Sequence, residues 1–158
     1  MNWFKFPTSS PNIPSSILYD ENTFYQAFFK DLESCQKEVI VESPFITSSR
    51  MEKIYPIFKR ILDRRTKVLI ITRNPSDLDA SIRDFATNEV MQMADMRIDI
   101  ASLKGNHHRK LAIIDRSITW EGSLNILSQN NSLEIMRRIE DKKTAEYLIN
   151  FIKLKVLI

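Results

Sequence analysis

The sequence predicts an α/β fold in which a mixed β-sheet is flanked by helices on both faces. Short apolar runs alternate with segments of helical periodicity along the chain, which is the pattern of α/β domains. The run TKVLIIT at residues 66–72 holds four consecutive large apolar residues, so this strand leaves no face to water. A hairpin-like series of strands in the second half indicates that part of the sheet is antiparallel.

The first half of the chain supplies the alternating helices and strands. Residues 21–35 carry apolar side chains at helical spacing, and Asp20 is placed to cap the start of that helix. Residues 49–52, Ser-Arg-Met-Glu, match a capping box and predict a second helix that runs to about Arg65. Pro56 is expected early in that helix or at a kink in it. The other elements expected in this half are strands at residues 37–44, 66–72 and 97–102 and a helix over 77–96.

The second half supplies the remaining strands and the last helix. A helix is expected from Asp141 to the C-terminus. Residues 1–16 are rich in proline and serine and are expected to form an N-terminal arm or linker, which leaves residues 17–158 as one domain. The strands expected in this half are residues 108–114, 118–124 and 133–140.

Composition and charge narrow the class of protein. The net charge of +3 and pI of about 9.0 suit an anionic partner. The N-terminal residues lack the apolar core of a signal peptide, and the chain has no run of about 18 apolar residues that could span a membrane. The lone cysteine, Cys35, cannot form an intramolecular disulfide and is expected on the inner face of a helix. These features together predict a cytoplasmic protein.

Polar side chains gather on two neighbouring strands of the second half. Side chains two apart share one face of a strand, so His108 and Lys110 point the same way. A tight turn through residues 116–117 would place Lys110 opposite Ser123 and His108 opposite Asn125. One face would then hold an imidazole, an ammonium, a hydroxyl and an amide, which together suit the oxygens of a phosphoryl group.

The residues around this face favour phosphoryl transfer without a metal. Both glycines of the chain, Gly105 and Gly122, bracket it, and each is expected where the backbone approaches a neighbour closely or takes a positive φ. Histidine can attack phosphorus or move protons near neutral pH. A metal site fits poorly, because His107 and His108 face opposite ways and the chain has no HExxH motif. No metal or cofactor is therefore expected, and His107 is expected to be structural or at the surface.

The spacing of these residues resembles a known signature. His108-Arg-Lys110 is followed after four residues by Asp115, and after six more by Gly-Ser-Leu-Asn at residues 122–125. This ordered pair, H-x-K-x4-D and G-S-x-N, resembles the motif of the phospholipase D superfamily. The helix and strand pattern of residues 17–158 also resembles one repeat of that fold, a phospholipase D-like sandwich, so the resemblance covers nearly the whole chain.

The resemblance implies a role for each matching residue. His108 becomes the candidate nucleophile, which forms a phosphohistidine intermediate. Lys110, Ser123 and Asn125 would hold the non-bridging oxygens of the phosphate. Asp115 would organise the motif without touching the substrate.

A later glutamate matches the family less fully. Family members often carry an N-x-E sequence whose glutamate orients the histidine. Here the corresponding residues are Ser132-Leu-Glu134, so the glutamate is present and a serine replaces the asparagine. Glu134 is expected either to orient His108 or to be an ordinary carboxylate on the surface of the sheet.

The family's active site uses two such motifs, and this chain contains one. The resemblance therefore implies a homodimer with the site across the two-fold axis, each subunit giving one histidine. If the chain is a piece of a longer protein, the second copy can instead lie elsewhere in that protein. The expected activity is that of a metal-independent phosphodiesterase, foremost a nuclease, with DNA favoured over RNA as partner. The alternatives are a phospholipid phosphodiesterase and a non-catalytic module that binds nucleic acid.

Other residues carry weaker signals. Arg73 ends a buried strand at the edge where α/β sheets bind ligands. Arg137 and Arg138 are expected either to contact phosphates or to lie on a solvated strand face. Trp120 is expected in the core or at its rim.

Overall fold

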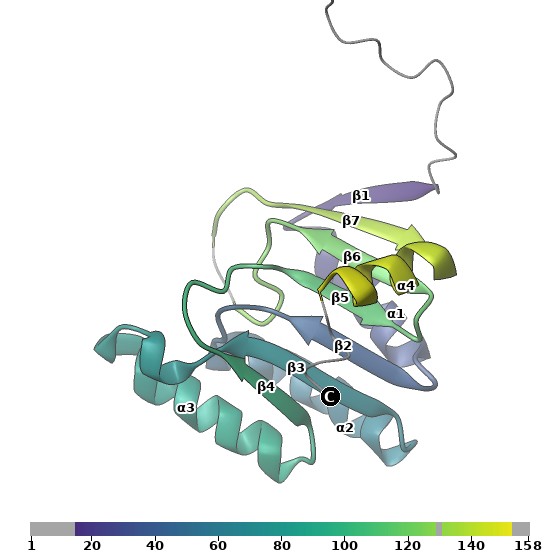
Figure 1. Ribbon diagram of the computed structural model, residues 1–158. Coiled ribbons are helices and arrows are strands. Elements are labelled where there is room, and N and C mark those ends of the chain that lie inside the picture. The colour runs from purple at the N-terminus through teal and green to yellow at the C-terminus, as the bar shows by residue number, and fades with distance from the viewer. Residues whose placement is uncertain (1–14, 129–130, 153–158) are drawn as a thin grey trace, which may run out of the picture.

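The computed structural model describes residues 15–128 and 131–152 (Figure 1), and within them a seven-stranded sheet runs in the order β1-β7-β6-β5-β2-β3-β4. In chain order the elements are β1 (Ser16–Asp20), α1 (Phe24–Ser34), β2 (Glu38–Glu42), α2 (Ser48–Asp63), β3 (Lys67–Arg73), the 3-10 turn η1 (Pro75–Asp77), α3 (Ala80–Asp95), β4 (Asp99–Leu103), β5 (Leu111–Ile114), β6 (Ile118–Gly122), β7 (Ile135–Glu140) and α4 (Lys142–Phe151). None of these helices is long and apolar enough to cross a membrane.

The sheet is mixed, as the sequence predicts. Strands β2, β3 and β4 are parallel, and the helices α2 and α3 make the crossovers between them. Strands β5, β6, β7 and β1 join antiparallel on the other side of β2. The carboxyl ends of β2 and β3 therefore lie at the same edge as the start of β5 and the end of β6, here called the motif edge.

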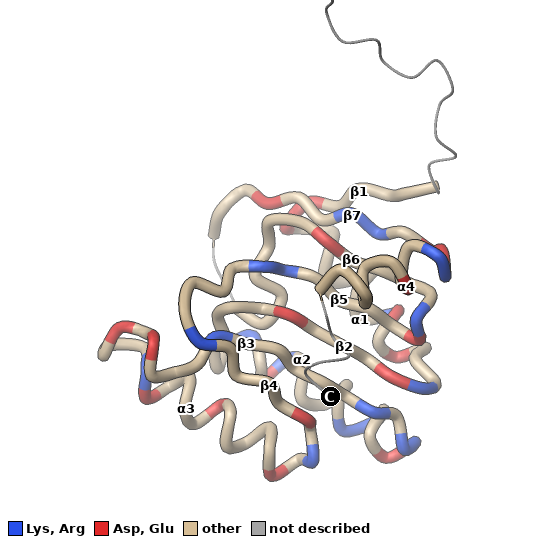
Figure 2. Tube along the Cα trace, in the orientation of Figure 1, with Lys and Arg blue, Asp and Glu red and all other residues tan. Residues whose placement is uncertain are grey.

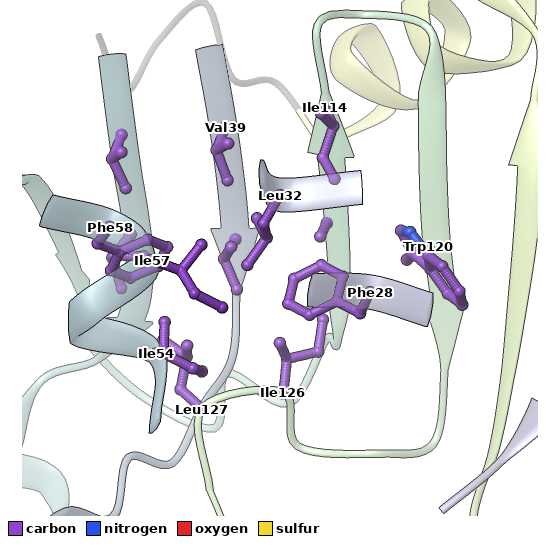
Figure 3. Close-up of a cluster of buried hydrophobic side chains, with 14 of the residues drawn as sticks. Phe28, Leu32, Val39, Ile54, Ile57, Phe58, Ile114, Trp120, Ile126 and Leu127 are labelled. Carbon is purple, nitrogen blue, oxygen red and sulfur yellow. The ribbon is translucent and has the colours of Figure 1, made fainter. Parts of the chain in front are cut away.

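Helices cover both faces of the sheet. The helices α1, α2 and α3 pack on one face around Phe28, Ile54 and Trp120 (Figure 3), and α4 packs on the other face. Val39 and Ile40, neighbours in β2, belong to the two different cores, because successive side chains of a strand point to opposite faces. Each large side chain so buried contributes about 1.5–3 kcal/mol. The apolar run in β3 is confirmed as a strand covered on both sides.

The starts of two helices differ from the sequence-based expectation. Asp20 accepts hydrogen bonds from the N–H of Asn22 (3.1 Å) and of Thr23 (2.9 Å), so it holds the turn before α1, and Thr23 is the N-cap. The capping box expected at residues 49–52 is wrong, because α2 begins at Ser48 and has Thr47 as its N-cap. Pro56 lies within α2, and α4 begins as expected, with the side chain of its N-cap Asp141 accepting from the N–H of Thr144.

The first strand of the sheet was not expected. Residues 1–14 of the expected arm lie outside the described residues, but Ser16 already belongs to β1, which pairs with β7 along the outer edge of the sheet. Ile17 and Leu18 are 53% and 56% exposed. An edge strand with so little buried surface lacks the alternating pattern by which a strand is recognised.

The hairpin of β5 and β6 has a register one residue from the expected one. Leu111 pairs with Glu121 and Ile114 with Ile118, so three residues form the turn rather than two. Asp115 and Arg116 both have a φ of +51°, and the N–H of Ser117 donates to the carbonyl of Ile114 (3.0 Å). Lys110 therefore lies across from Gly122, whose N–H reaches its carbonyl at 3.4 Å, and not across from Ser123.

Candidate active site

All of the motif residues except Asp115 come together at the motif edge. Residues 108–110 form the irregular segment that enters β5, beside the carboxyl end of β2, where Glu42 pairs with Leu111. Ser123 and Asn125 lie in the loop that leaves β6 at the same edge, here called the motif loop. Antiparallel pairing of β5 with both β2 and β6 thus gathers segments that are distant in the sequence.

His108 and Lys110 are in direct contact. The Nζ of Lys110 lies 3.0 Å from the Nδ1 of His108 and donates to the carbonyl of His108 (2.8 Å). An ammonium can only donate, so the ring nitrogen that faces it is an acceptor. Partial burial lowers the pKa of Lys110, and the charge of Glu134 opposes that shift. The imidazole of His108 is exposed, with the ring of Phe45 edge-on at 6.3 Å.

These two side chains open onto a cavity of about 440 Å³. Its lining also includes Gly122 and the side chains of Leu18, Ile135 and Arg137. Figure 2 shows basic segments at the start of β5 and along β7, on either side of β6. Glu121 also lines the cavity, so the wall has a basic part, an apolar part and one carboxylate.

Ser123 and Glu134 join the two loops that border the site. The hydroxyl of Ser123 donates to Oε2 of Glu134 and accepts from the N–H of Ile135 (3.1 Å). The hydroxyl of Ser132, which stands where the family often has asparagine, donates to the other carboxylate oxygen of Glu134 (2.6 Å). The N–H of Glu134 donates to Oε2 of Glu21 (3.0 Å). Glu134 therefore ties the start of β7 to the motif loop, at a place where its charge acts on Lys110.

Asn125 is partly buried, and its Oδ1 has no hydrogen-bond partner in the part of the chain that the structure describes. Its backbone carbonyl accepts from the N–H of Ser128 (3.0 Å), which closes a turn of the loop. A buried polar atom without a partner is costly unless a ligand supplies one. Asn125 thus has capacity for a further hydrogen bond at the motif edge.

Asp115 lies apart from the other motif residues, at the opposite end of β5. Its carboxylate accepts from the N–H groups of Gln36 (2.9 Å), Lys37 (2.8 Å) and Glu38 (3.1 Å) and from the thiol of Cys35 (3.1 Å). Burial works to raise the pKa of Asp115, but these hydrogen bonds prevail and lower it. Burial, and then the Asp115 carboxylate, raise the pKa of the Cys35 thiol to about 12. Asp115 therefore fastens the hairpin turn to the start of β2.

Both glycines stand where the backbone requires them. A Cβ on Gly122 would lie 2.1 Å from the carbonyl oxygen of Ile135, so β7 passes too closely for any side chain. Gly105 has a φ of +85°, which side chains disfavour. The two constraints expected of scarce glycine, close approach and positive φ, are each found at one of the two positions.

A buried carboxylate behind the motif was missed by sequence reasoning. Glu42, at the end of β2, is fully buried, and its Oε1 accepts from Nε of Arg109 (2.7 Å). The Nε2 of His107 lies 3.4 Å from the same oxygen, without hydrogen-bond geometry. We call Glu42, His107 and Arg109 the Glu42 anchor. A carboxylate that ends a buried strand, as in EVIVE, marks the position in the sequence, but this pattern does not distinguish a buried carboxylate from an exposed one.

The Glu42 anchor holds both neighbours of His108. Burial raises the pKa of Glu42, opposed by the hydrogen bond and charge of Arg109. Burial, together with the positive charges of Arg109, Lys110 and other nearby groups, lowers the pKa of His107 to about 4. His107 is therefore neutral at pH 7 and structural, as expected.

Of the remaining candidate residues, one lines the cavity and the others form hydrogen bonds within the fold. Arg137 lines the cavity, whereas Arg138 donates to both carboxylate oxygens of Asp31 (2.8 and 3.0 Å), which also accepts from the fully buried Trp120. Arg73 donates to Oδ1 of Asn106 (3.0 Å), in the loop before the motif. Within residues 15–128 and 131–152 no three His, Cys, Asp or Glu side chains gather closely enough to hold a metal ion.

Comparisons with known proteins place this geometry in a family. The family model described as "Cardiolipin synthase, PLD-like domain" matches residues 28–154. No curated protein matches the chain. Among solved structures, Nuc, a phospholipase D family member from Salmonella typhimurium, has a TM-score of 0.71 at 15% identity, with 88% of this chain and 91% of that chain covered. NucT from Helicobacter pylori has a TM-score of 0.67 at 19% identity, with 88% and 93% covered.

A third similar structure has a different context. TrmBL2, described as an archaeal chromatin protein with a novel mode of DNA binding, has a TM-score of 0.60 at 12% identity, with 92% of this chain and 54% of that chain covered. At such identities the structures establish a shared fold, and the family model, which spans most of the chain, establishes the family. The chain belongs to the phospholipase D-like domain family.

Proposed function

We propose that this chain is a metal-independent phosphodiesterase that cleaves a nucleic-acid backbone through a phosphohistidine at His108. The observation that carries the proposal is the contact between His108 and Lys110 at the mouth of an open cavity. Family membership supports phosphodiester chemistry. The net charge of +3 and Arg137 on the cavity wall support a polyanionic substrate. We propose DNA over RNA because TrmBL2, which has a similar fold, is described as binding DNA.

The reaction has two steps that balance in protons. A ring nitrogen of His108 bonds to phosphorus while the bond from phosphorus to the leaving oxygen breaks, and a second histidine, as imidazolium, protonates that oxygen. Water then attacks the phosphohistidine, the P–N bond breaks, and the second histidine takes the proton of the water. Lys110 and the side-chain amide of Asn125 would donate to the non-bridging oxygens in both steps. The hydroxyl hydrogen of Ser123, which Glu134 accepts in the free chain, would turn to a non-bridging oxygen when the substrate binds. The charge of Glu134 would keep the Lys110 ammonium in place.

The second histidine is proposed to come from a second copy of the chain. The sequence contains one copy of the motif. Figure 1 shows α4 over the part of β5 and β6 that adjoins their turn, away from the motif edge. At the motif edge the cavity is lined by Leu18 and Ile135, which are 56% and 52% exposed. A copy related by a two-fold axis would cover these side chains and bring its own histidine to the site.

The test is cleavage of single-stranded and double-stranded DNA and of RNA in excess EDTA. We expect cleavage that His108→Ala abolishes and that Arg60→Gln, a surface change in α2, leaves intact. Cleavage that requires an added metal would contradict the mechanism. Binding of nucleic acid without any cleavage would instead identify a non-catalytic module.

The shared site has its own test. Subunits of wild type and of His108→Ala are mixed, unfolded together and refolded in varied ratios. Because each shared site needs two histidines, the activity per wild-type subunit should fall as the fraction of variant rises. Unchanged activity per wild-type subunit would show that one chain suffices.

A phospholipid phosphodiesterase is the second candidate, favoured by the apolar part of the cavity wall and by a family model that describes a cardiolipin synthase domain. The same EDTA assay with phosphatidyl lipid vesicles separates the two. Hydrolysis of lipid, with nucleic acid left intact, would replace the nuclease proposal and retain the phosphohistidine chemistry.

A further inference from the structure

A second polar pocket lies beside the motif loop, on the side of the sheet that α1 and α2 cover. Its volume is about 300 Å³. Arg50 in the first turn of α2, Tyr25 in α1 and Glu21 before α1 contribute to its wall. The polar side chains of Asn22, Ser128 and Asn131 line the rest. We call it the Arg50 pocket.

Arg50 is a buried cation without an anionic partner. It is 9% exposed, and its Nε has no hydrogen-bond partner. Neither a hydrogen bond nor an ion pair joins its guanidinium to any residue of 15–128 or 131–152. Burial lowers the pKa of Arg50, yet a guanidinium stays charged at neutral pH. A buried charge of this kind is costly unless something pairs with it.

The contact that Arg50 does make fixes its orientation. The carbon of its guanidinium lies 3.4 Å from the centroid of the Tyr25 ring. The hydroxyl of Tyr25 donates to the carbonyls of Ile126 (3.1 Å) and Ser128 (3.4 Å), so these bonds hold the ring of this α1 residue against the motif loop. Burial raises the pKa of Tyr25 to about 12, so the phenol keeps its proton and supplies no negative charge.

The carboxylate in the pocket wall is engaged elsewhere. Oε2 of Glu21 accepts from the N–H of Glu134 (3.0 Å) and Oε1 accepts from the side chain of Asn22 (3.2 Å). Glu21 thus leaves Arg50 unpaired while adding one negative charge to the wall. The wall therefore combines one cation, Arg50, with one carboxylate, Glu21. Because the carboxylate repels a ligand with two negative charges more than a ligand with one, a singly charged ligand suits the pocket better.

The Arg50 pocket is linked to the motif residues through the loop that leaves β6. Leu124, between Ser123 and Asn125 of the motif, forms part of its wall. Glu134, whose side chain holds Ser123, is bonded through its backbone to Glu21, and its charge also acts on Tyr25. The loop that leaves β6 therefore borders the Arg50 pocket, and Gly122, the residue from which that loop starts, lines the cavity of His108.

We propose that the Arg50 pocket binds a phosphodiester group, that of the nucleotide next to the scissile phosphate. The planar fork of a guanidinium matches two phosphate oxygens, and the amides of Asn22 and Asn131 and the hydroxyl of Ser128 offer further donors. A phosphodiester carries one negative charge, which fits the wall formed by Arg50 and Glu21. That the phosphodiester belongs to nucleic acid rests on the proposed function, whereas phosphodiester binding by the pocket does not.

Binding is tested first without catalysis. The probe is dimethyl phosphate, added to ¹⁵N-labelled His108→Ala protein while the arginine Nε–H signals are followed by NMR. Arg50→Met identifies the signal of Arg50, and Arg60→Met identifies a matched arginine of the same helix. We expect a saturable shift of the Arg50 signal and none of the Arg60 signal. No shift of Arg50, or equal shifts of both signals, would overturn the proposal.

A stability measurement separates a binding role from a structural one. Met keeps the apolar contact with Tyr25 and removes the unpaired charge, so Arg50→Met should melt no lower than wild type in the absence of phosphodiester. Dimethyl phosphate should raise the Tm of wild type and not that of the variant. A lower Tm for Arg50→Met, together with an unchanged response to dimethyl phosphate, would mean that Arg50 is structural. Arg50→Lys, which keeps the charge and loses the fork, should give a weaker response than wild type.

Cleavage assays then show whether the phosphodiester that the pocket binds belongs to nucleic acid or to a lipid. On an oligonucleotide, Arg50→Met should raise KM by about 10-fold with kcat little changed, since a charge-assisted pair is lost. On bis(p-nitrophenyl) phosphate, which has no neighbouring phosphate, the variant should match wild type. An equal loss on both substrates would place Arg50 in the active site and overturn the proposal. If wild type cleaves only lipid while the NMR response persists, the proposed function fails and the pocket binds a lipid phosphodiester instead.

Discussion

His107 and His108 are adjacent in the chain, yet they lie in opposite environments. His107 turns inward to the Glu42 anchor, where its side chain is 5% exposed and its ring is neutral. His108 turns outward to an open cavity and contacts the ammonium of Lys110. The inward side fixes the backbone of the motif and the outward side presents the imidazole proposed to react. A shift of one residue along the chain therefore separates a structural imidazole from the proposed nucleophile.

The strongest test of this difference between the two histidines removes each imidazole in turn. His108→Ala should lower cleavage by about 10⁴-fold or more, the loss typical of removing a nucleophile. His107→Ala should lower it far less, because His107 acts only through the backbone. The measurement is kcat/KM in EDTA at a temperature where circular dichroism shows both variants folded. Equal losses for the two variants would refute the division of roles.

The second test uses the pH dependence of stability. The pKa of His107 is lowered to about 4 in the folded chain from 6.5, so between these values the unfolded chain takes up a proton that the folded chain does not. Stability is therefore complete above pH 6.5 and falls by about 3 kcal/mol as the pH drops to 4. Urea unfolding of wild type and of His107→Gln across this range isolates the effect. A fall of the same size in both proteins would show that other groups cause it.

Apolar periodicity and the alternation of side chains along a strand predicted much of this arrangement. Where these patterns failed, each failure has a specific cause. The buried β3 and the outward pairing of His108 with Lys110 follow from patterns along a single segment. The register of the hairpin does not, because Asp115 joins the turn in order to bind the N–H groups at the start of β2. A bond to a distant segment leaves no trace in local periodicity.

The Glu42 anchor and the Arg50 pocket were missed for the same reason. A glutamate after EVIV has the same local pattern whether it ends in water or is fully buried, and only the packing of β2 against the segment before β5 decides. Arg50 shares a helical face with the buried Ile54 and Ile57, but an arginine at the start of a helix does not by itself indicate burial. The contact with Tyr25 of α1 is what the pattern of α2 alone cannot show. Contacts between elements therefore set the parts of the site that the sequence alone did not predict.

The third test removes the charge of the Glu42 anchor while keeping its shape. Glu42→Gln should lower the free energy of unfolding by about 1.5–3 kcal/mol, the usual value of a hydrogen bond between charged groups. It should also lower kcat by about 10-fold, since small displacements of a reacting group are costly. Glu38→Gln, at the other end of β2 and paired with Arg116, is the matched control. It should reduce stability slightly and leave kcat unchanged, and a similar loss of kcat in both variants would remove the positioning role.

The smallest expected effect concerns Arg137 and Arg138, which repeat the contrast of the histidines on β7. Arg138 is bound to Asp31 beneath the sheet, and Arg137 lines the cavity. If Arg137 contacts a substrate phosphate, Arg137→Gln should weaken nucleic-acid binding to His108→Ala protein and reduce the slope of log affinity against log salt by about 1. Arg138→Gln should lower the Tm and leave that slope unchanged, because its guanidinium is already paired. A titration of binding at several salt concentrations decides, and an unchanged slope for Arg137→Gln would mean that this arginine only borders the cavity.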